Sequence, residues 1–146
     1  MSVTTLTVAQ ASTRVVRLQG GGLRFLDVQQ MPDEHFQVVT RPNHELDNTQ
    51  QWRIIDLGRG VSAIQQISSG RFLEAHEAEE LDFRVVTRPR RSIDSQRWRI
   101  QDLGGGFLAI EQLSSGRFIE ATVDGDFIVV TRPSGNSEQT WRIGEL

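Results

Sequence analysis

Short apolar runs alternate with turn-forming residues along the whole chain. No window sustains the 3.6-residue apolar period of an amphipathic helix. Brief runs rich in Val, Ile, Phe and Trp are typical of β-strands, and clusters rich in glycine and serine separate them. These clusters are Gly20–Gly22, Ser68–Gly70, Gly104–Gly106 and Ser114–Gly116. The pattern predicts an all-β chain of short strands.

Three of the apolar runs occur three times, at intervals of about 45 residues, which is the signature of an internal repeat. Arg-Phe-(Leu/Ile)-(Asp/Glu) lies at 24–27, 71–74 and 117–120, Val-Val-Thr-Arg-Pro at 38–42, 85–89 and 129–133, and Gln-x-Trp-Arg-Ile at 50–54, 96–100 and 139–143. A proline ends the second run each time, because proline lacks the N–H that a strand ladder needs. The chain therefore contains three copies of one unit.

A fourth run completes each unit, and its copies show that the arrangement is circular. Val61–Gln66 matches Phe107–Gln112, whereas the third copy, Val15–Gln19, lies near the N-terminus. We expect one domain over 1–146, with units at about 20–66, 67–112 and 113–146 and the last completed by a strand at 12–19. Four strands in three units predict twelve strands. Three units are too few for a typical propeller and favour a closed threefold barrel with a hairpin cap.

Nine of the ten aromatic residues lie at equivalent positions of the three units. They are Trp52, Trp98 and Trp141, then Phe25, Phe72 and Phe118, and finally Phe36, Phe83 and Phe127. We expect all nine rings to pack in a shared threefold core, where large rings contribute most burial. We also expect the glutamine two residues before each tryptophan to bond backbone at a tight turn.

Composition limits the partners and cofactors. The net charge of −3 argues against a nucleic-acid partner. All sixteen basic residues are arginine. Without cysteine there are no disulfides or thiolate metal sites, and no cofactor or metal is expected. No secretory signal or apolar stretch of membrane-spanning length is visible, so we expect a cytoplasmic protein by default without membrane insertion, although release by a non-standard route stays open.

The threefold Q-x-W signature, each copy preceded by an acidic first strand, resembles the ricin B-chain-type lectins. The resemblance covers the whole chain and implies an all-β β-trefoil with up to three shallow sugar pockets, one per unit. In that family a pocket typically combines an aspartate of the first strand, an aromatic ring of the second strand and a polar residue just before Q-x-W. Glycans of galactose or mannose type, or an anionic sugar, are the partners that the resemblance implies.

The family positions can be followed residue by residue in this chain. The acidic position is filled by Asp27, Glu74 and Glu120, and the polar position by Asn48 and Thr49, Ser95, and Glu138. The aromatic position has no counterpart, because 37–42, 84–89 and 128–133 contain no ring. Phe36, Phe83 and Phe127 would replace it only if their rings turned outward.

The Thr-Arg-Pro arginines Arg41, Arg88 and Arg132 allow two interpretations. Each either grips a hydroxyl or an anionic sugar, or bonds loop carbonyls or the acidic residue of its own unit. Repeat symmetry duplicates structural and functional residues alike, so their recurrence fits both.

Catalysis is not expected, because no nucleophile elbow, P-loop or dinucleotide fingerprint is present. The loops 28–35, 75–82 and 121–126 vary most between units and are rich in acidic residues. The leading hypothesis is a carbohydrate-binding, lectin-like protein. The alternatives are a protein-interaction or inhibitor β-trefoil, and a symmetric scaffold without sugar binding. The oligomeric state stays open, a homodimer included.

Overall fold

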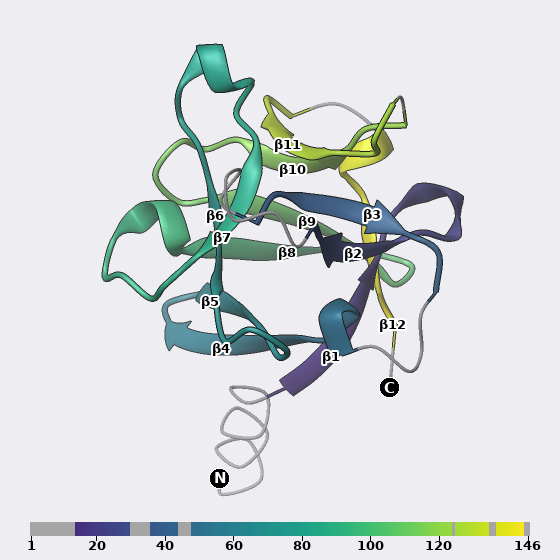
Figure 1. Cartoon of the computed structure of the whole chain (residues 1–146). Helices are drawn as coiled ribbons and strands as arrows, with labels where there is room; N and C mark the ends of the chain where they lie inside the picture. Colours follow the sequence, from purple (N-terminus) through teal and green to yellow (C-terminus); the bar gives the residue numbers. More distant parts are fainter. Residues whose placement is uncertain (1–13, 30–35, 44–47, 124, 135–136, 145–146) are drawn as a thin grey trace, which may run out of the picture.

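The computed structural model describes residues 14–29, 36–43, 48–123, 125–134 and 137–144, which form twelve strands in one antiparallel sheet (Figure 1). The strands are β1 (Arg14–Gln19), β2 (Phe25–Val28), β3 (Val38–Arg41), β4 (Trp52–Gly58), β5 (Val61–Gln66), β6 (Phe72–Ala75), β7 (Val85–Arg88), β8 (Trp98–Gly104), β9 (Phe107–Gln112), β10 (Phe118–Ala121), β11 (Val129–Arg132) and β12 (Trp141–Gly144). Short 3₁₀ turns join some of them: η1 (Gly21–Leu23), η3 (Asn48–Gln50), η4 (Glu79–Leu81), η5 (Asp94–Gln96) and η6 (Ser137–Gln139).

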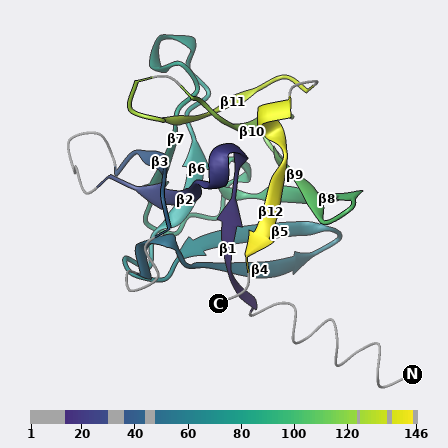
Figure 2. The ribbon, with the colours of Figure 1, turned by 90° about the vertical axis from the view of Figure 1, so that its right-hand side faces the viewer.

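Six strands close into a barrel. The pairings run β1–β4, β4–β5, β5–β8, β8–β9, β9–β12 and back from β12 to β1. Figure 2 shows β1 and β12 side by side, with Leu18 opposite Ile143. The first described strand thus pairs with the last, and the barrel leaves no open sheet edge.

Three hairpins, β2–β3, β6–β7 and β10–β11, form the cap. Each hairpin joins the other two through a single antiparallel bridge: Gln37 to Val86, Val39 to Ile128 and Arg84 to Val130. Six barrel strands and three capping hairpins make a β-trefoil, and the predicted fold class is confirmed.

The hairpins β4–β5 and β8–β9 turn in the same way. The Asp56 carboxylate accepts a hydrogen bond from the Gly58 N–H at 2.8 Å, and Asp102 does the same for Gly104. Gly58 and Gly104 have φ angles of 92° and 86°, a left-handed conformation that glycine adopts without steric cost. The repeated Asp-Leu-Gly sequence therefore encodes both the turn and its local shift in register.

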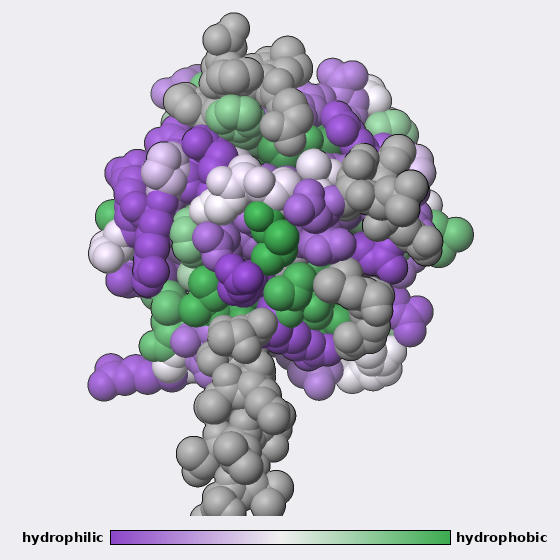
Figure 3. Space-filling model, turned by 60° about the horizontal axis from the view of Figure 1, so that its bottom comes forward, coloured by the Kyte–Doolittle hydropathy of each residue, from purple (hydrophilic) through white to green (hydrophobic). Residues whose placement is uncertain are grey.

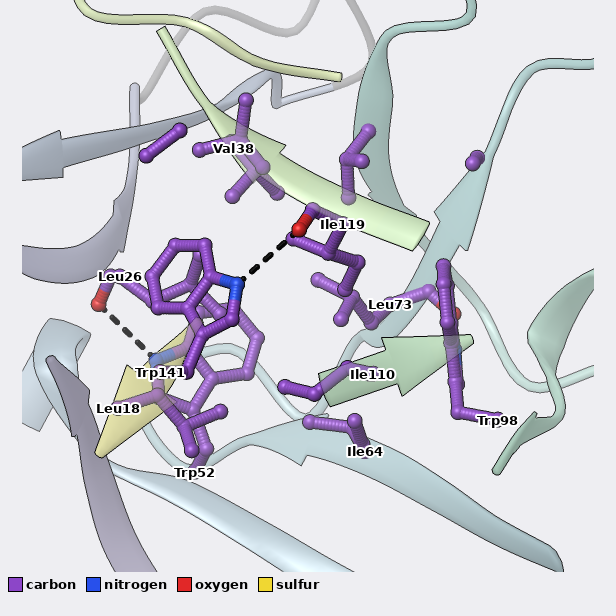
Figure 4. Close-up of a cluster of buried hydrophobic side chains, with 14 of the residues drawn as sticks. Leu18, Leu26, Val38, Trp52, Ile64, Leu73, Trp98, Ile110, Ile119 and Trp141 are labelled. Atoms are coloured by element: carbon purple, nitrogen blue, oxygen red, sulfur yellow. Dashed lines mark hydrogen bonds between the residues drawn. The ribbon is translucent and has the colours of Figure 1, made fainter. Parts of the chain in front are cut away.

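The tryptophans fill the centre of the molecule (Figure 4), as predicted. Their side chains are fully buried, and each indole N–H donates to a backbone carbonyl of the first strand of its unit, at 3.0–3.1 Å. These acceptors are Leu26, Leu73 and Ile119, whose own side chains pack in the same cluster. Each buried ring thus satisfies its polar atom while it ties a barrel strand to a capping hairpin.

The prediction that all nine rings share this core is confirmed for the three tryptophans, and Phe36 packs against their cluster. It is wrong for the other five rings, which lie outside the cluster: Phe25, Phe72, Phe118, Phe83 and Phe127. Side chains along a strand alternate between the two faces of a sheet. Because Leu26 and its equivalents face the core, the preceding phenylalanine must face the other way. The acidic residue after Leu26 shares that outer face with the phenylalanine.

Candidate functional site

The acidic residue of each unit lies on the face of its strand opposite the core and is held by the Q-x-W glutamine. The glutamine side-chain N–H donates to the carboxylate at 3.0–3.2 Å in all three units. The pairs are Gln50 with Asp27, Gln96 with Glu74, and Gln139 with Glu120. This bond fixes where the carboxylate points, and sequence reasoning missed it.

The same glutamines also bond the backbone, as predicted. The amide donates to the carbonyl of the proline that ends the second strand of the unit, at 2.6–2.9 Å. In the second unit the Gln96 oxygen also accepts the N–H of Arg91 at 2.8 Å. A single glutamine therefore ties the acidic strand, the Thr-Arg-Pro strand and the 3₁₀ turn together.

The three carboxylates differ in access. Asp27 is 1% exposed, and its second oxygen accepts the backbone N–H of Val28 at 2.7 Å. Glu74 is 6% exposed and lies 3.6 Å from the Arg88 guanidinium. Glu120 is partly exposed. The third unit therefore presents the most accessible acidic group.

The Thr-Arg-Pro arginines have different partners in different units. Arg88 pairs with the acidic residue of its own unit. Arg132 instead reaches a loop of the second unit, where it pairs with the Asp82 carboxylate at 2.7 Å and donates to the Asp82 carbonyl. The arginine of the second unit thus binds the acidic residue of its own unit, and that of the third unit binds a loop carbonyl. Arg41, in the first unit, is partly exposed.

The polar positions before Q-x-W lie on the 3₁₀ turns. The Thr49 and Ser95 carbonyls accept bonds from Gln66 and Gln112, so their backbone is fixed to the barrel. Asn48 and Glu138 are exposed at the rim. In each unit, the Q-x-W glutamine therefore bonds the acidic residue and lies in the same 3₁₀ turn as the polar residues.

Comparison with known proteins identifies the family. The family model described as "Ricin-type beta-trefoil lectin domain-like" matches residues 48–128, more than half of the chain. The chain belongs to this family. A search of curated proteins found no sequence match.

Solved structures resemble this lectin-like trefoil over nearly its whole length. The designed threefold-symmetric protein ThreeFoil has 26% identity and a TM-score of 0.80, covering 90% of this chain and 99% of its own. A Polyporus squamosus lectin, solved with a sialylated influenza-binding epitope, has 15% identity and a TM-score of 0.81, covering 92% of this chain and 50% of its own. The Haemophilus ducreyi cytolethal distending toxin has 17% identity and a TM-score of 0.74, covering 93% and 85%.

The trefoil cap holds a ring of arginines that sequence reasoning also missed. Arg24, Arg71 and Arg117 each donate to the hydroxyl and the carbonyl of the threonine in their own unit, at 2.5–3.2 Å. Each guanidinium also lies over a phenylalanine of another unit, 3.6–4.4 Å from the ring centroid. The threonines are Thr40, Thr87 and Thr131, and the phenylalanines, in the same order, are Phe127, Phe36 and Phe83.

These arginine contacts bear on whether the phenylalanines before the Val-Val-Thr-Arg-Pro strands could stack on a sugar. Phe36, Phe83 and Phe127 all have φ angles of 53–56°, a conformation that bulky residues rarely adopt. A guanidinium occupies one face of each ring, so that face is not available to stack on a sugar. Burial lowers the pKa of Arg71 and of Arg117, and a second arginine, Arg88 or Arg132, lowers it further. At Arg117 the carboxylates of Asp82 and Glu120 oppose this shift.

The described part of the chain contains neither a cluster of metal-ligating side chains nor a helix that could span a membrane. No group of three or more His, Asp or Glu side chains gathers there as a metal site would require. No helix in that part has the length and apolar character to cross a bilayer.

Proposed function

We propose that this trefoil is a non-catalytic carbohydrate-binding module whose leading glycan site lies in the third unit. One observation carries the proposal: Glu120 is partly exposed and is oriented by Gln139, while Arg132, the Thr-Arg-Pro arginine of its unit, pairs with Asp82. A carboxylate in this setting accepts hydrogen bonds from two adjacent sugar hydroxyls. Glu138 is exposed on η6, the turn that contacts β10.

The other two units support a weaker role. Asp27 uses both oxygens within the protein, and Arg88 neutralises Glu74. A sugar would have to displace these partners, and a buried group that loses its hydrogen bond costs about 1–3 kcal/mol. We therefore expect one accessible site instead of three equal ones.

The missing aromatic ring sets the expected strength. The second strands carry no ring, and the capping phenylalanines are covered by arginines. Affinity must then come from hydrogen bonds exposed to water, so we expect dissociation constants on the order of 1 mM for a single site, worth about 4 kcal/mol. Several copies of the module on one surface would strengthen binding through multivalency.

The deciding experiment is a glycan array, followed by titration of the best glycan into wild type and Glu120→Gln. The substitution keeps the shape of the side chain but removes the charged acceptor, so we expect affinity to fall about tenfold, as for the loss of one charge-assisted hydrogen bond. Glu80→Gln, an exposed change on η4, is the matched control and should bind like wild type. A wild-type protein that binds no glycan, or a Glu120→Gln variant with unchanged affinity, contradicts this site.

A protein-interaction module is the second candidate, and exposed apolar side chains favour it. Figure 3 shows apolar side chains gathered in the middle of a largely polar face. Among the described residues, Leu57 and Leu103 at the barrel hairpins are 41% and 51% exposed. If a protein ligand binds at the exposed barrel hairpins, Leu103→Ser should weaken its binding and leave glycan titrations unchanged.

A further inference from the structure

A hollow outside the acidic sites lies between the first and second units. Leu57, Ala63 and Phe72 supply its apolar side. Its polar side is formed by Arg90, Arg91, Ser92, Gln96 and Arg97. No acidic residue is among the described residues that line it. The hollow therefore combines an apolar wall with three arginines, of which Arg97 is ion-paired with Asp94.

The positive side of the hollow is held in place by the fold. Buried Gln96 donates to the Pro89 carbonyl at 2.9 Å and accepts the N–H of Arg91 at 2.8 Å, which fixes the loop backbone. The Arg90 guanidinium lies 5.7 Å from the centre of the Phe72 ring. Asp94 holds Arg97 through a 2.8 Å ion pair. The backbone that carries these arginines therefore needs little ordering when an anion binds, which lowers the cost of binding.

The arginines of the hollow break the threefold symmetry of the chain. Asn43, His44 and Gln51 fill the corresponding positions of the first unit, after the proline and after the Q-x-W glutamine, and Ser134, Gly135 and Thr140 fill those of the third. Residues on which the trefoil depends, such as the tryptophans and the capping arginines, recur in all three units. Arg90, Arg91 and Arg97 are therefore not required by the fold.

We propose that this hollow binds the anionic group, carboxylate or sulfate, of an acidic saccharide. Guanidinium groups match the geometry of both anions and donate two parallel hydrogen bonds to either. The apolar wall offers a surface to the C–H groups of the sugar ring that carries the anion. The site is separate from the acidic position of the second unit, where Glu74 is buried against Arg88. The inference rests on the proposed function only in taking a saccharide as the ligand.

The test is calorimetric titration with three probes: a sulfated uronate-containing disaccharide, its neutral analogue and inorganic sulfate. Arg90→Asn with Arg97→Gln installs the residues of the first unit and removes two charges. The matched control, Arg14→Gln with Arg142→Gln, removes two exposed charges elsewhere. We expect the acidic disaccharide to lose at least about tenfold in affinity in the first variant and less than about twofold in the control. Added salt should weaken wild-type binding, because the hollow is open to solvent.

Three results would overturn the proposal. They are no binding of the acidic disaccharide by wild type, an equal loss in both double variants, and inorganic sulfate binding as tightly as the disaccharide, which would indicate a bare anion site. Glu120→Gln separates this inference from the proposed function, because it should weaken a glycan bound at the third unit and leave binding at the hollow unchanged. Thermal melts of each variant confirm that the fold is intact.

Discussion

At the scale of single residues, the Q-x-W glutamine is the group on which each candidate site depends. Gln50 is fully buried and joins Asp27 to the Pro42 carbonyl. The sequence predicted the backbone bond but not the carboxylate bond. Alternation along the strand, applied to Phe25 and Leu26, would have placed the acidic side chain on the face away from the core.

Gln50→Ala tests this role by its effect on stability. The substitution removes the Gln50 donor from the buried Asp27 carboxylate and from the Pro42 carbonyl, and we expect a loss of about 1–3 kcal/mol in the free energy of unfolding. Urea denaturation measures it. The neighbouring Gln51→Ala is the matched control, because the hydrogen bonds of Gln51 to other described residues involve its backbone, and it should stay within about 0.5 kcal/mol of wild type. Equal losses in the two variants would refute the role of Gln50.

At the scale of elements, the capping hairpins are joined by arginines rather than by long strand pairings. Each pair of hairpins shares one isolated bridge, and Arg24, Arg71 and Arg117 each link two units. The repeated Arg-Phe motif was visible in the sequence, but its partners were not. The arginine bonds the second strand of its own unit and stacks on a ring of another, and those contacts exist only after the hairpins meet.

Arg71→Lys tests whether the capping arginines Arg24, Arg71 and Arg117 stabilise the fold. Lysine keeps the charge but lacks the planar fork that bonds the Thr87 hydroxyl and carbonyl together and covers the Phe36 ring. We expect a loss of about 1–3 kcal/mol in unfolding free energy. Arg99→Lys changes an exposed arginine with a longer, 3.8 Å ion pair and should cost less than about 0.5 kcal/mol in the same urea experiment. If the capping arginines contribute nothing to stability, the two variants will have the same midpoint of urea denaturation.

At the scale of the whole molecule, threefold repetition made the fold predictable and left the sites unequal. Twelve strands and a tryptophan core follow from motifs that recur in the sequence. The access of each carboxylate does not follow, because it depends on pairings between units. Arg132 pairs with Asp82, fifty residues away, whereas Arg88 pairs with Glu74, the acidic residue of its own unit.

The central claim is that a glycan binds at the third unit, and amide NMR during a glycan titration tests it most directly. We expect the largest amide chemical-shift changes in β10 and η6, around Glu120 and Gln139. The changes at the equivalent residues of the first unit should be far smaller. Shifts of equal size around Asp27 and Gln50, or no shifts at any glycan concentration that the sample tolerates, would contradict it.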